Sequence, residues 1–488
     1  MFNRLKSAFR ERDRRRFFFT FLAGKMIGLA LAGFGAVFLT SFLGSPASAA
    51  EAPVPTVTDV INATNTMWVL IAAFLVFFMQ AGFMMLEAGF ARTREVGNIL
   101  IECIVDTALC GLLFWAFGFA FMFGNGNKFI GHEFFFLNGA PSTYGTTGVA
   151  FMAFFLFQFA FADTCSTITS GAMVGRTGFV GDLLYSTVVS GFIYPIWGHW
   201  VWGPNGWLAT MKTPFRDFAG STVVHTVGGM IALTGAIALG PRLGRKFKRD
   251  GGGLPAGHDM TIAAVGGVLL WFGWYGFNPG STLSALDAAG MGRVATNTTL
   301  AAAAGALSAM AFVYPRLKKW DIGITVNGFL GGLVAITAPC YWVNTTGSVI
   351  IGAIAGVIVV VGVDLVEWFR VDDPIGAVAV HGLCGIFGTL SLGFFATGQF
   401  GLPTPTGVDT STLVKGLFWG GGLDQLKAQF IGSFVIASTT LLAGFALMYA
   451  VKSTGTLRIS EEGEREGIDI HEHGASVYHP EAAFTGGT

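Results

Sequence analysis

Eleven long apolar segments dominate the sequence, and each is long enough to cross a lipid bilayer as a helix. They lie near residues 64–90, 97–123, 147–173, 179–202, 219–240, 260–281, 293–314, 321–341, 346–369, 374–397 and 428–451. Only 12% of the 488 residues are charged and 52% are hydrophobic, which excludes a soluble multidomain chain. The sequence therefore predicts an all-α integral membrane protein with eleven transmembrane helices.

The first 49 residues have the pattern of a secretory signal peptide. Residues 1–25 carry eight Lys and Arg, residues 26–43 are apolar, and Ala47-Ser48-Ala49 is a small-residue cleavage site. The alternative is a first membrane helix that is retained. Cleavage predicts a mature N-terminus outside the cell, a membrane domain over residues 50–451, and a polar, acid-rich tail over residues 452–488.

Positive charge is distributed unevenly among the loops between the segments. Odd-numbered loops hold twelve Lys and Arg, whereas even-numbered loops hold six. Because Lys and Arg concentrate on the cytoplasmic side of membrane proteins, the odd loops are expected in the cytoplasm. The N-terminus is then outside and the tail inside, in agreement with the signal peptide. We expect a multi-pass protein of the inner membrane.

One motif occurs twice, in segments five and ten. The stretches from Asp217 to His225 and from Asp373 to His381 share Asp, Gly three residues later, Val seven later, His eight later and Gly twelve later. The two segments enter the membrane from opposite sides, so segments one to five and six to ten form an inverted repeat, with segment eleven extra. An acidic residue suits a helix N-terminus, and eight helical residues place each His about 12 Å deeper. The sequence thus predicts His225 and His381 side by side near mid-membrane.

Two histidines inside a membrane indicate a functional site, because an unsatisfied ionisable side chain is costly there. Adjacent neutral imidazoles can hydrogen bond to each other and share a proton. The plainer alternative is that each His bonds a backbone carbonyl and only packs helices. A metal site is disfavoured because two ligands do not complete one and the five Cys lack metal-ligand spacing. No cofactor is expected, and zero net charge gives no basis for nucleic-acid binding.

Aromatic residues surround the expected position of the histidines. Phe157 and Phe161 are four residues apart on one helix face, and Trp202 and Ser281 both lie at the external ends of their segments. An aromatic face beside a hydroxyl captures a small cation, although interfacial aromatic belts explain the same residues equally well. A dry tunnel excludes an intact ion by its desolvation cost, but a cation that sheds its proton escapes that cost. Ammonium can become ammonia, whereas sodium and potassium have no such neutral form.

These motifs resemble those of the ammonium transporter family, over about residues 64–479. Besides the two Asp-to-His motifs, the similarity is carried by Gln158-Phe159-Ala160-Phe161-Ala162, by Tyr194-Pro195 to Trp202-Gly203, and by Gly273 to Asn278. The resemblance implies a homotrimer with one pore per subunit. It assigns external recruitment to Phe157, Phe161, Trp202 and Ser281, the gate to Phe161 and Phe277, a proton relay to His225 and His381, and structural or coupling roles to Asp217, Trp274 and Asp373. Expected partners are ammonium or ammonia, membrane lipid, and a PII-type regulatory protein on the tail.

Two features depart from the family pattern. Asp163, two residues after Phe161, is acidic where a small or neutral residue is expected, and it points away from the gate. We expect a helix–helix hydrogen bond there, with an added proton site as the alternative. The long 124–146 loop, with four Phe, is expected to fold as an external cap.

The functional hypothesis is transmembrane ammonium transport, and not enzyme catalysis. Ammonium is captured outside, loses a proton at the Phe gate, and passes as ammonia while the proton follows the two histidines. The alternative is an ammonium sensor that binds without significant transport and signals through the tail.

Overall fold

The structure, a computed structural model, describes residues 54–478, so the expected signal peptide and the last ten residues lie outside the described residues. Ten helical spans in the described part are long and apolar enough to cross a membrane. They are α3 (Val57–Phe90), α4 (Val96–Leu113) with η1 (Phe114–Gly118) and α5 (Phe119–Phe123), α6 (Phe151–Gly171), α7 (Phe179–Val188) with η3 (Val189–Ile193) and α8 (Tyr194–Trp202), η4 (Ser221–Thr226) with α9 (Val227–Leu239), α10 (Met260–Phe277) with η6 (Pro279–Thr282), α11 (Ala288–Leu317), α13 (Thr345–Trp368), η7 (Val378–Leu383) with α14 (Cys384–Phe395), and α15 (Asp424–Ser453).

The predicted segment 321–341 forms a shorter helix than expected. This helix, α12 (Ile322–Thr337), has 16 residues and spans about 24 Å at 1.5 Å per residue. Pro339 contributes to the early end, because a proline has no N–H to continue the helical hydrogen bonds, and the N–H of Ala338 donates to Ser221 Oγ instead. The chain therefore continues from α12 into a turn at Ala338.

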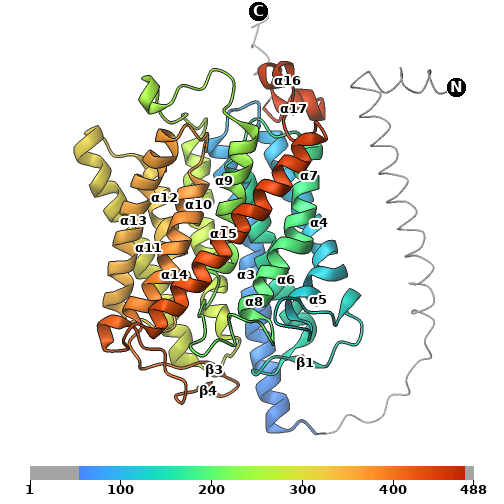
Figure 1. Cartoon of the computed structure of the whole chain (residues 1–488), viewed down its shortest axis with the longest axis vertical. Coiled ribbons are helices and arrows are strands. Elements are labelled where there is room, and N and C mark those ends of the chain that lie inside the picture. Colours follow the sequence, from blue (N-terminus) through green and yellow to red (C-terminus); the bar gives the residue numbers. More distant parts are fainter. Residues whose placement is uncertain (1–53, 479–488) are drawn as a thin grey trace, which may run out of the picture. The chain divides into compact units, whose positions relative to one another are not determined.

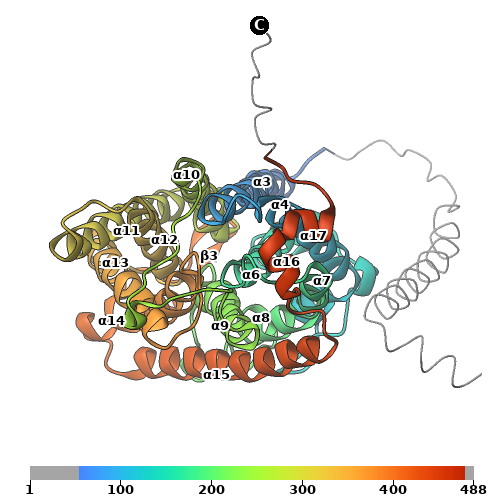
Figure 2. The ribbon, with the colours of Figure 1, turned by 90° about the horizontal axis from the view of Figure 1, so that it is seen from above.

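The spans form two groups, α3 to α9 and α10 to α14, shown from the side in Figure 1 and from above in Figure 2. The first helices of the two groups, α3 and α10, pack antiparallel. Gly89 near the end of α3 contacts Ala263 near the start of α10, and Ala72 of α3 contacts Gly276 near the end of α10. This opposite direction is the arrangement that an inverted repeat requires. Helix α15 packs against α7, α9 and α14, so it joins both groups.

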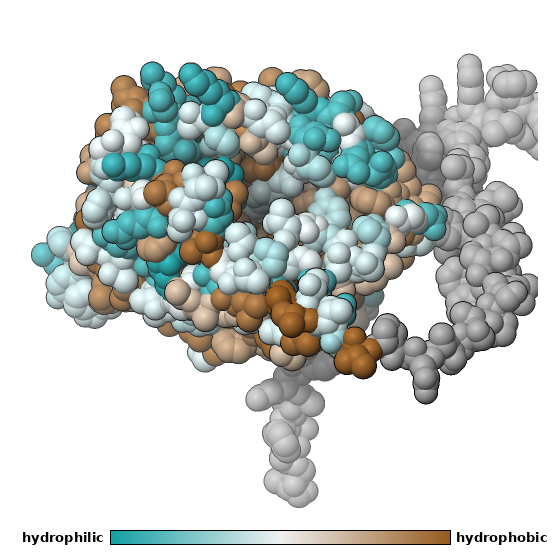
Figure 3. All heavy atoms as spheres, turned by 90° about the horizontal axis from the view of Figure 1, so that it is seen from below, coloured by the Kyte–Doolittle hydropathy of each residue, from teal (hydrophilic) through white to brown (hydrophobic). Residues whose placement is uncertain are grey.

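One end of the bundle, here called the strand end, carries two short hairpins, β1 (Thr143–Tyr144) with β2 (Val149–Ala150) and β3 (Pro403–Thr404) with β4 (Gly407–Val408). The 124–146 loop packs on the bundle at this end. Its Tyr144 ring stacks on Phe154 of α6 with ring centroids 4.6 Å apart. The buried His199 ring also holds the loop. Its Nδ1 lies 2.8 Å from the carbonyl oxygen of Met122 in α5, and its Nε2 lies 2.9 Å from the carbonyl oxygen of Asn127 in the loop. Hydrophilic and neutral side chains cover most of this face, which is hollowed near its middle (Figure 3).

The opposite end, here called the tail end, carries α16 (Glu461–Glu466) and α17 (Ile468–His473). The tail is docked onto the membrane domain, because the buried Asp469 carboxylate accepts the N–H groups of Gly97 and Asn98, both at 2.9 Å. An anion at these first amides of α4 also suits the positive end of the helix dipole. Residue 469 thus caps the second span of the protein.

Candidate functional site

The two repeated histidines meet at the centre of the bundle, where η4 crosses η7. Their Nδ1 atoms are 3.2 Å apart, and their rings lie 5.2 Å apart at 24°. His225 is fully buried and His381 is 6% exposed. Because one Nδ1 must donate and the other accept, the contact holds one shared proton when both rings are neutral. This direct contact differs from the alternative in which each ring bonds a backbone carbonyl.

The aspartate of each motif caps the backbone that carries the histidine. Asp217 accepts four amide N–H groups, from residues 220–223 at 2.8–3.0 Å. Asp373 accepts three, from residues 376–378 at 2.9–3.1 Å. The shared glycines adopt positive φ, +115° at Gly220 and +82° at Gly376, which other residues rarely reach. All of these bonds come from backbone amides of the turn that follows each aspartate, so the role of both carboxylates in the structure is to hold these turns.

Both histidines lie in π-helical turns, and the expected regular helix from Asp to His is not formed. The turns are η4 and η7, and they pass into α9 and α14 two and three residues after their histidines, respectively. The last glycine of each motif packs on the other copy: a Cβ at Gly229 would come within 2.3 Å of Gly382 N, and one at Gly385 within 2.4 Å of Ser221 O. The repeated Gly therefore lets the two turns cross closely enough for the rings to touch.

Aromatic rings continue the line of the histidines toward the strand end. Phe161 stacks on Phe277 with centroids 3.9 Å apart at 22°, and Phe277 lies 5.4 Å from His225. Trp274 flanks the same imidazole at 5.1 Å and donates to Thr337 Oγ1 at 2.9 Å. The two Phe rings are buried, so they close the approach to the histidines in this conformation.

The residues predicted to recruit a cation gather on the outer side of this stack. Phe157 lies 4.7 Å and Trp202 lies 6.1 Å from the Phe161 ring. The Trp202 indole donates to Asp217 O at 2.8 Å, and Ser281 Oγ donates to Phe277 O at 2.8 Å. The Ser281 oxygen keeps its lone pairs as acceptors. All of the predicted site residues thus belong to one continuous constellation.

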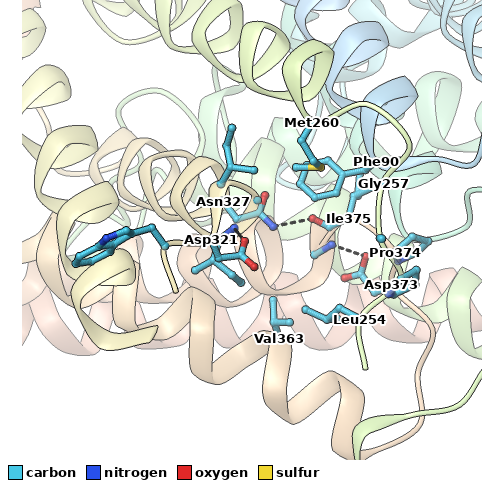
Figure 4. Close-up of a pocket in the computed structure, with 17 residues that line it drawn as sticks. Phe90, Leu254, Gly257, Met260, Asp321, Asn327, Val363, Asp373, Pro374 and Ile375 are labelled. Atoms are coloured by element: carbon cyan, nitrogen blue, oxygen red, sulfur yellow. Dashed lines mark hydrogen bonds between the residues drawn. The ribbon is translucent and has the colours of Figure 1, made fainter. Parts of the chain in front are cut away.

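A cavity of about 420 Å³ opens on the tail-end side of the second motif (Figure 4). Its lining includes Asp373, Ile375 and Asn327, and the Asn327 amide donates to Ile375 O at 2.8 Å. The sequence analysis missed this cavity, because its walls come from five separate stretches of the chain. Its position at Asp373 mirrors the position of the aromatic cluster at Asp217.

A buried ion pair supports the loop before that cavity. Arg242 donates to both carboxylate oxygens of Asp372, at 2.8 and 2.9 Å, and Arg176 donates to the Asp372 carbonyl at 2.6 Å. Burial alone would raise the pKa of Asp372, but the bonds and charge of Arg242 outweigh it and hold this pKa well below its usual range. Burial lowers the pKa of Arg176 to about 10.

Buried carboxyls are the functional candidates that the sequence analysis largely missed. Asp163 is fully buried beside Thr107 and Gln80, yet neither of its carboxyl oxygens has a hydrogen-bond partner among the described residues. These two side chains come from α4 and α3, as the expected helix–helix contact requires, but they lie beyond normal hydrogen-bond length. Four further buried acids share the same group of spans: Glu87, Glu102, Asp106 and Asp182.

The described residues contain no group of three or more His, Cys, Asp or Glu arranged to hold a metal ion. All five cysteines are buried with free thiols. The aromatic rings present faces that can bind a cation, and the contact between the histidines can exchange a proton.

Comparison with known proteins shows that the chain is similar to members of one family. The sequence model of the Ammonium Transporter Family matches residues 67–478. The chain is 44% identical to ammonium transporter Amt2 of Archaeoglobus fulgidus, over 84% of this chain and 87% of that protein. It is 40% identical to a putative ammonium transporter of Synechocystis sp., over 92% and 97%. Among solved structures, a Sensor Amt Protein matches with 35% identity and a TM-score of 0.76, over 85% and 99%. Candida albicans Mep2 matches with 27% identity and a TM-score of 0.72, over 82% and 87%. These matches confirm the family resemblance and a multi-pass membrane fold.

Proposed function

The chain belongs to the ammonium transporter family, and we propose that it moves ammonium across the inner membrane by separating ammonia from its proton. The observation that carries the proposal is the continuous stack of Phe161, Phe277, His225 and His381. The proposal includes the orientation expected from the loop charges, with the strand end outside and the tail end in the cytoplasm.

Recruitment takes place on the outer aromatic cluster. An ammonium ion over Phe161 and Trp202 gains cation–π attraction, and it donates a hydrogen bond to the Ser281 oxygen. Phe157 completes the aromatic wall. Asp217 does not bind the ion directly, because backbone amides already occupy both of its oxygens.

Deprotonation follows at the Phe gate. The N–H bond of ammonium breaks, ammonia passes between Phe161 and Phe277, and the proton is taken up by the imidazole pair. A charged ion between buried rings would lose its hydration without gaining a partner, at a cost of tens of kcal/mol in the Born limit. Selectivity against sodium and potassium then depends on their inability to shed a proton.

The histidine pair passes the proton along the pore. Its Nδ1–Nδ1 contact of 3.2 Å lets one ring donate as the other accepts. His225 is the ring closer to the gate, because Phe277 stacks on it, and His381 leads toward the tail end. We also propose the homotrimer with one pore per subunit, and a PII-type protein that docks on the cytoplasmic tail.

A sensor is the second candidate, and two observations favour it. The chain is 35% identical to a Sensor Amt Protein, and its tail is bonded directly to the start of α4 through Asp469. In that case ammonium binding at the aromatic cluster changes the docking of the tail, with little transport.

The test is uptake of labelled methylammonium by cells that lack other ammonium carriers, with His225→Ala and His381→Ala as variants. Transport predicts uptake by the parent and a lower proton-coupled current in both variants on a solid-supported membrane. A pure sensor would bind the cation but would neither take it up nor restore growth on limiting ammonium. The matched control is Ser391→Ala, a buried hydroxyl on α14 that bonds only its own helix.

A further inference from the structure

Five buried carboxyls form a connected set in the first half of the membrane domain, and the pore does not use them. This set, here called the acid ladder, consists of Glu87 on α3, Glu102 and Asp106 on α4, Asp163 on α6 and Asp182 on α7, each at most 5% exposed. An acid inside a membrane-spanning segment is costly, so five on adjoining helices need an explanation.

The acids are neighbours in a defined order. Near the tail end, Glu87 accepts from Ser170 at 3.3 Å, and Tyr185 donates to Asp182. The Asp182 carboxyl adjoins Asp106, which lies one helical turn from Glu102. Asp163, beside Thr107, lies on α6 at a depth similar to that of Asp106, and Cys110 lies near both acids. Asp106 and Asp163 each lie eight to ten residues from the tail-end limit of their helix, or about 12–15 Å inside.

Unpartnered groups continue the ladder toward the strand end. Both Asp163 oxygens lack partners among the described residues, as do the hydroxyls of Ser190 and Tyr194, all three residues being fully buried. Ser190 adjoins Cys110, which also lies near Asp163 and Asp106, and Tyr194 lies within electrostatic range of Asp217. A buried hydroxyl without a hydrogen-bond partner is costly. We therefore infer that these groups form hydrogen bonds in another state of the transport cycle.

Helix packing does not require the ladder, because the second half of the same fold lacks it. Helices α10, α11, α12 and α14 contain no Asp or Glu. Helix α13 carries Asp364 and Glu367 only near its tail-end limit, where they bond Lys248 and Arg245. The helices of the two repeats pack in similar ways, but only the first repeat contains a connected set of buried carboxyls within its helices.

We propose that the acid ladder is a second proton relay, parallel to the histidine pair, between the level of the gate and the tail end. The inference rests on the proposed transport function. The N–H bond of ammonium breaks and ammonia enters the pore. Its proton passes through the Tyr194 and Ser190 hydroxyls to an Asp163 oxygen. Each later step breaks one carboxyl O–H bond as the next acid gains the proton, and the last acid releases it to water. The other titratable groups near the ladder include Cys103, Cys110, Tyr185 and, from the tail, Glu472, which acts on Glu102.

The test measures transported charge per methylammonium taken up, with the full-length protein in proteoliposomes. Asp163→Asn and Asp106→Asn keep the size and polarity of the side chain but cannot carry a proton. We expect both variants to lower the ratio of charge to uptake to the share that the histidine pair carries alone, because each variant removes a proton-transfer group from one of two parallel relays. Asp163→Glu should restore the ratio, whereas Ser391→Ala should leave it unchanged.

The outcomes separate the relay from the transport proposal. Asparagine variants that keep the parent ratio, while His225→Ala lowers it, would overturn the relay and leave transport intact. Uptake by the parent without current would also overturn the relay but not transport. A parent with neither uptake nor current would overturn both proposals. Where Asp163→Asn loses its folded state on size exclusion, Glu102→Gln and Asp106→Asn decide the question by the same ratio.

Discussion

The two motif aspartates should respond unequally to the same substitution. In Asp217, each carboxylate oxygen accepts two amide N–H groups, so Asp217→Asn leaves two buried donors facing an NH₂ group whichever way the amide turns. In Asp373, one oxygen accepts two amides and the other accepts only Val378 N, so Asp373→Asn can turn to leave a single donor unpaired. The structure therefore predicts a larger loss at the first motif.

The magnitudes follow from the cost of an unpaired buried donor, about 1–3 kcal/mol each. Asp217→Asn should destabilise η4 by about 2–6 kcal/mol, and Asp373→Asn should destabilise η7 by about 1–3 kcal/mol. The lower bound of 2 kcal/mol corresponds to about 30-fold faster opening of the turn, since 1.4 kcal/mol is tenfold.

Hydrogen exchange measured by mass spectrometry on the purified protein reports this opening locally. Peptides covering residues 220–226 in Asp217→Asn and residues 376–381 in Asp373→Asn are compared with the parent and with Ser391→Ala. Equal acceleration at the two motifs, or a larger effect in Asp373→Asn, would refute the account of these residues as backbone caps.

Three further predictions concern packing, pH and the tail. Gly229→Val should separate the two histidines and abolish uptake while the helices remain folded by circular dichroism, because its Cβ would lie 2.3 Å from Gly382 N. The folded pKa of Asp372 lies below its unfolded value of about 3.9, so its stabilisation is complete above that pH and is lost as pH falls further. Asp372→Asn should remove about 3–5 kcal/mol by leaving Arg242 buried without its partner, and should flatten the acid limb of a thermal-unfolding series. Asp469→Asn should release α17 and speed proteolysis of the tail; an unchanged cleavage rate would contradict the docking bonds.

The repeated motif was sufficient to predict the contact between His225 and His381, because residue type, spacing and loop charge are local properties. The π-helical turns were not predictable, because they depend on the close crossing at Gly229 and Gly385, which joins residues far apart in sequence. The early end of α12 had a local signal in Pro339, which the apolar run concealed.

The acid ladder was only partly visible in the sequence. Asp163 was noticed because it departs from a motif, whereas Glu102 and Asp106 lie in an apolar run without one. Their spacing of four residues places them on one helix face, and that pattern inside a membrane span was the available signal. The proximity of Asp182 to Asp106 depends on helix packing, which local patterns do not specify.

In the proposed transport mechanism, the gate of Phe161 and Phe277 acts by excluding water more than by blocking the path. The stack of Phe161 on Phe277 is worth about 0.5–1.5 kcal/mol beyond burial, so separating the rings costs little more than thermal energy. Ammonia therefore passes without a large barrier. An intact cation gains no relief from the same ring motion, because its desolvation cost is larger by an order of magnitude. A weak gate and high selectivity are compatible only if the region between Phe277 and His381 stays dry, and that requires a route for the proton within reach of the gate.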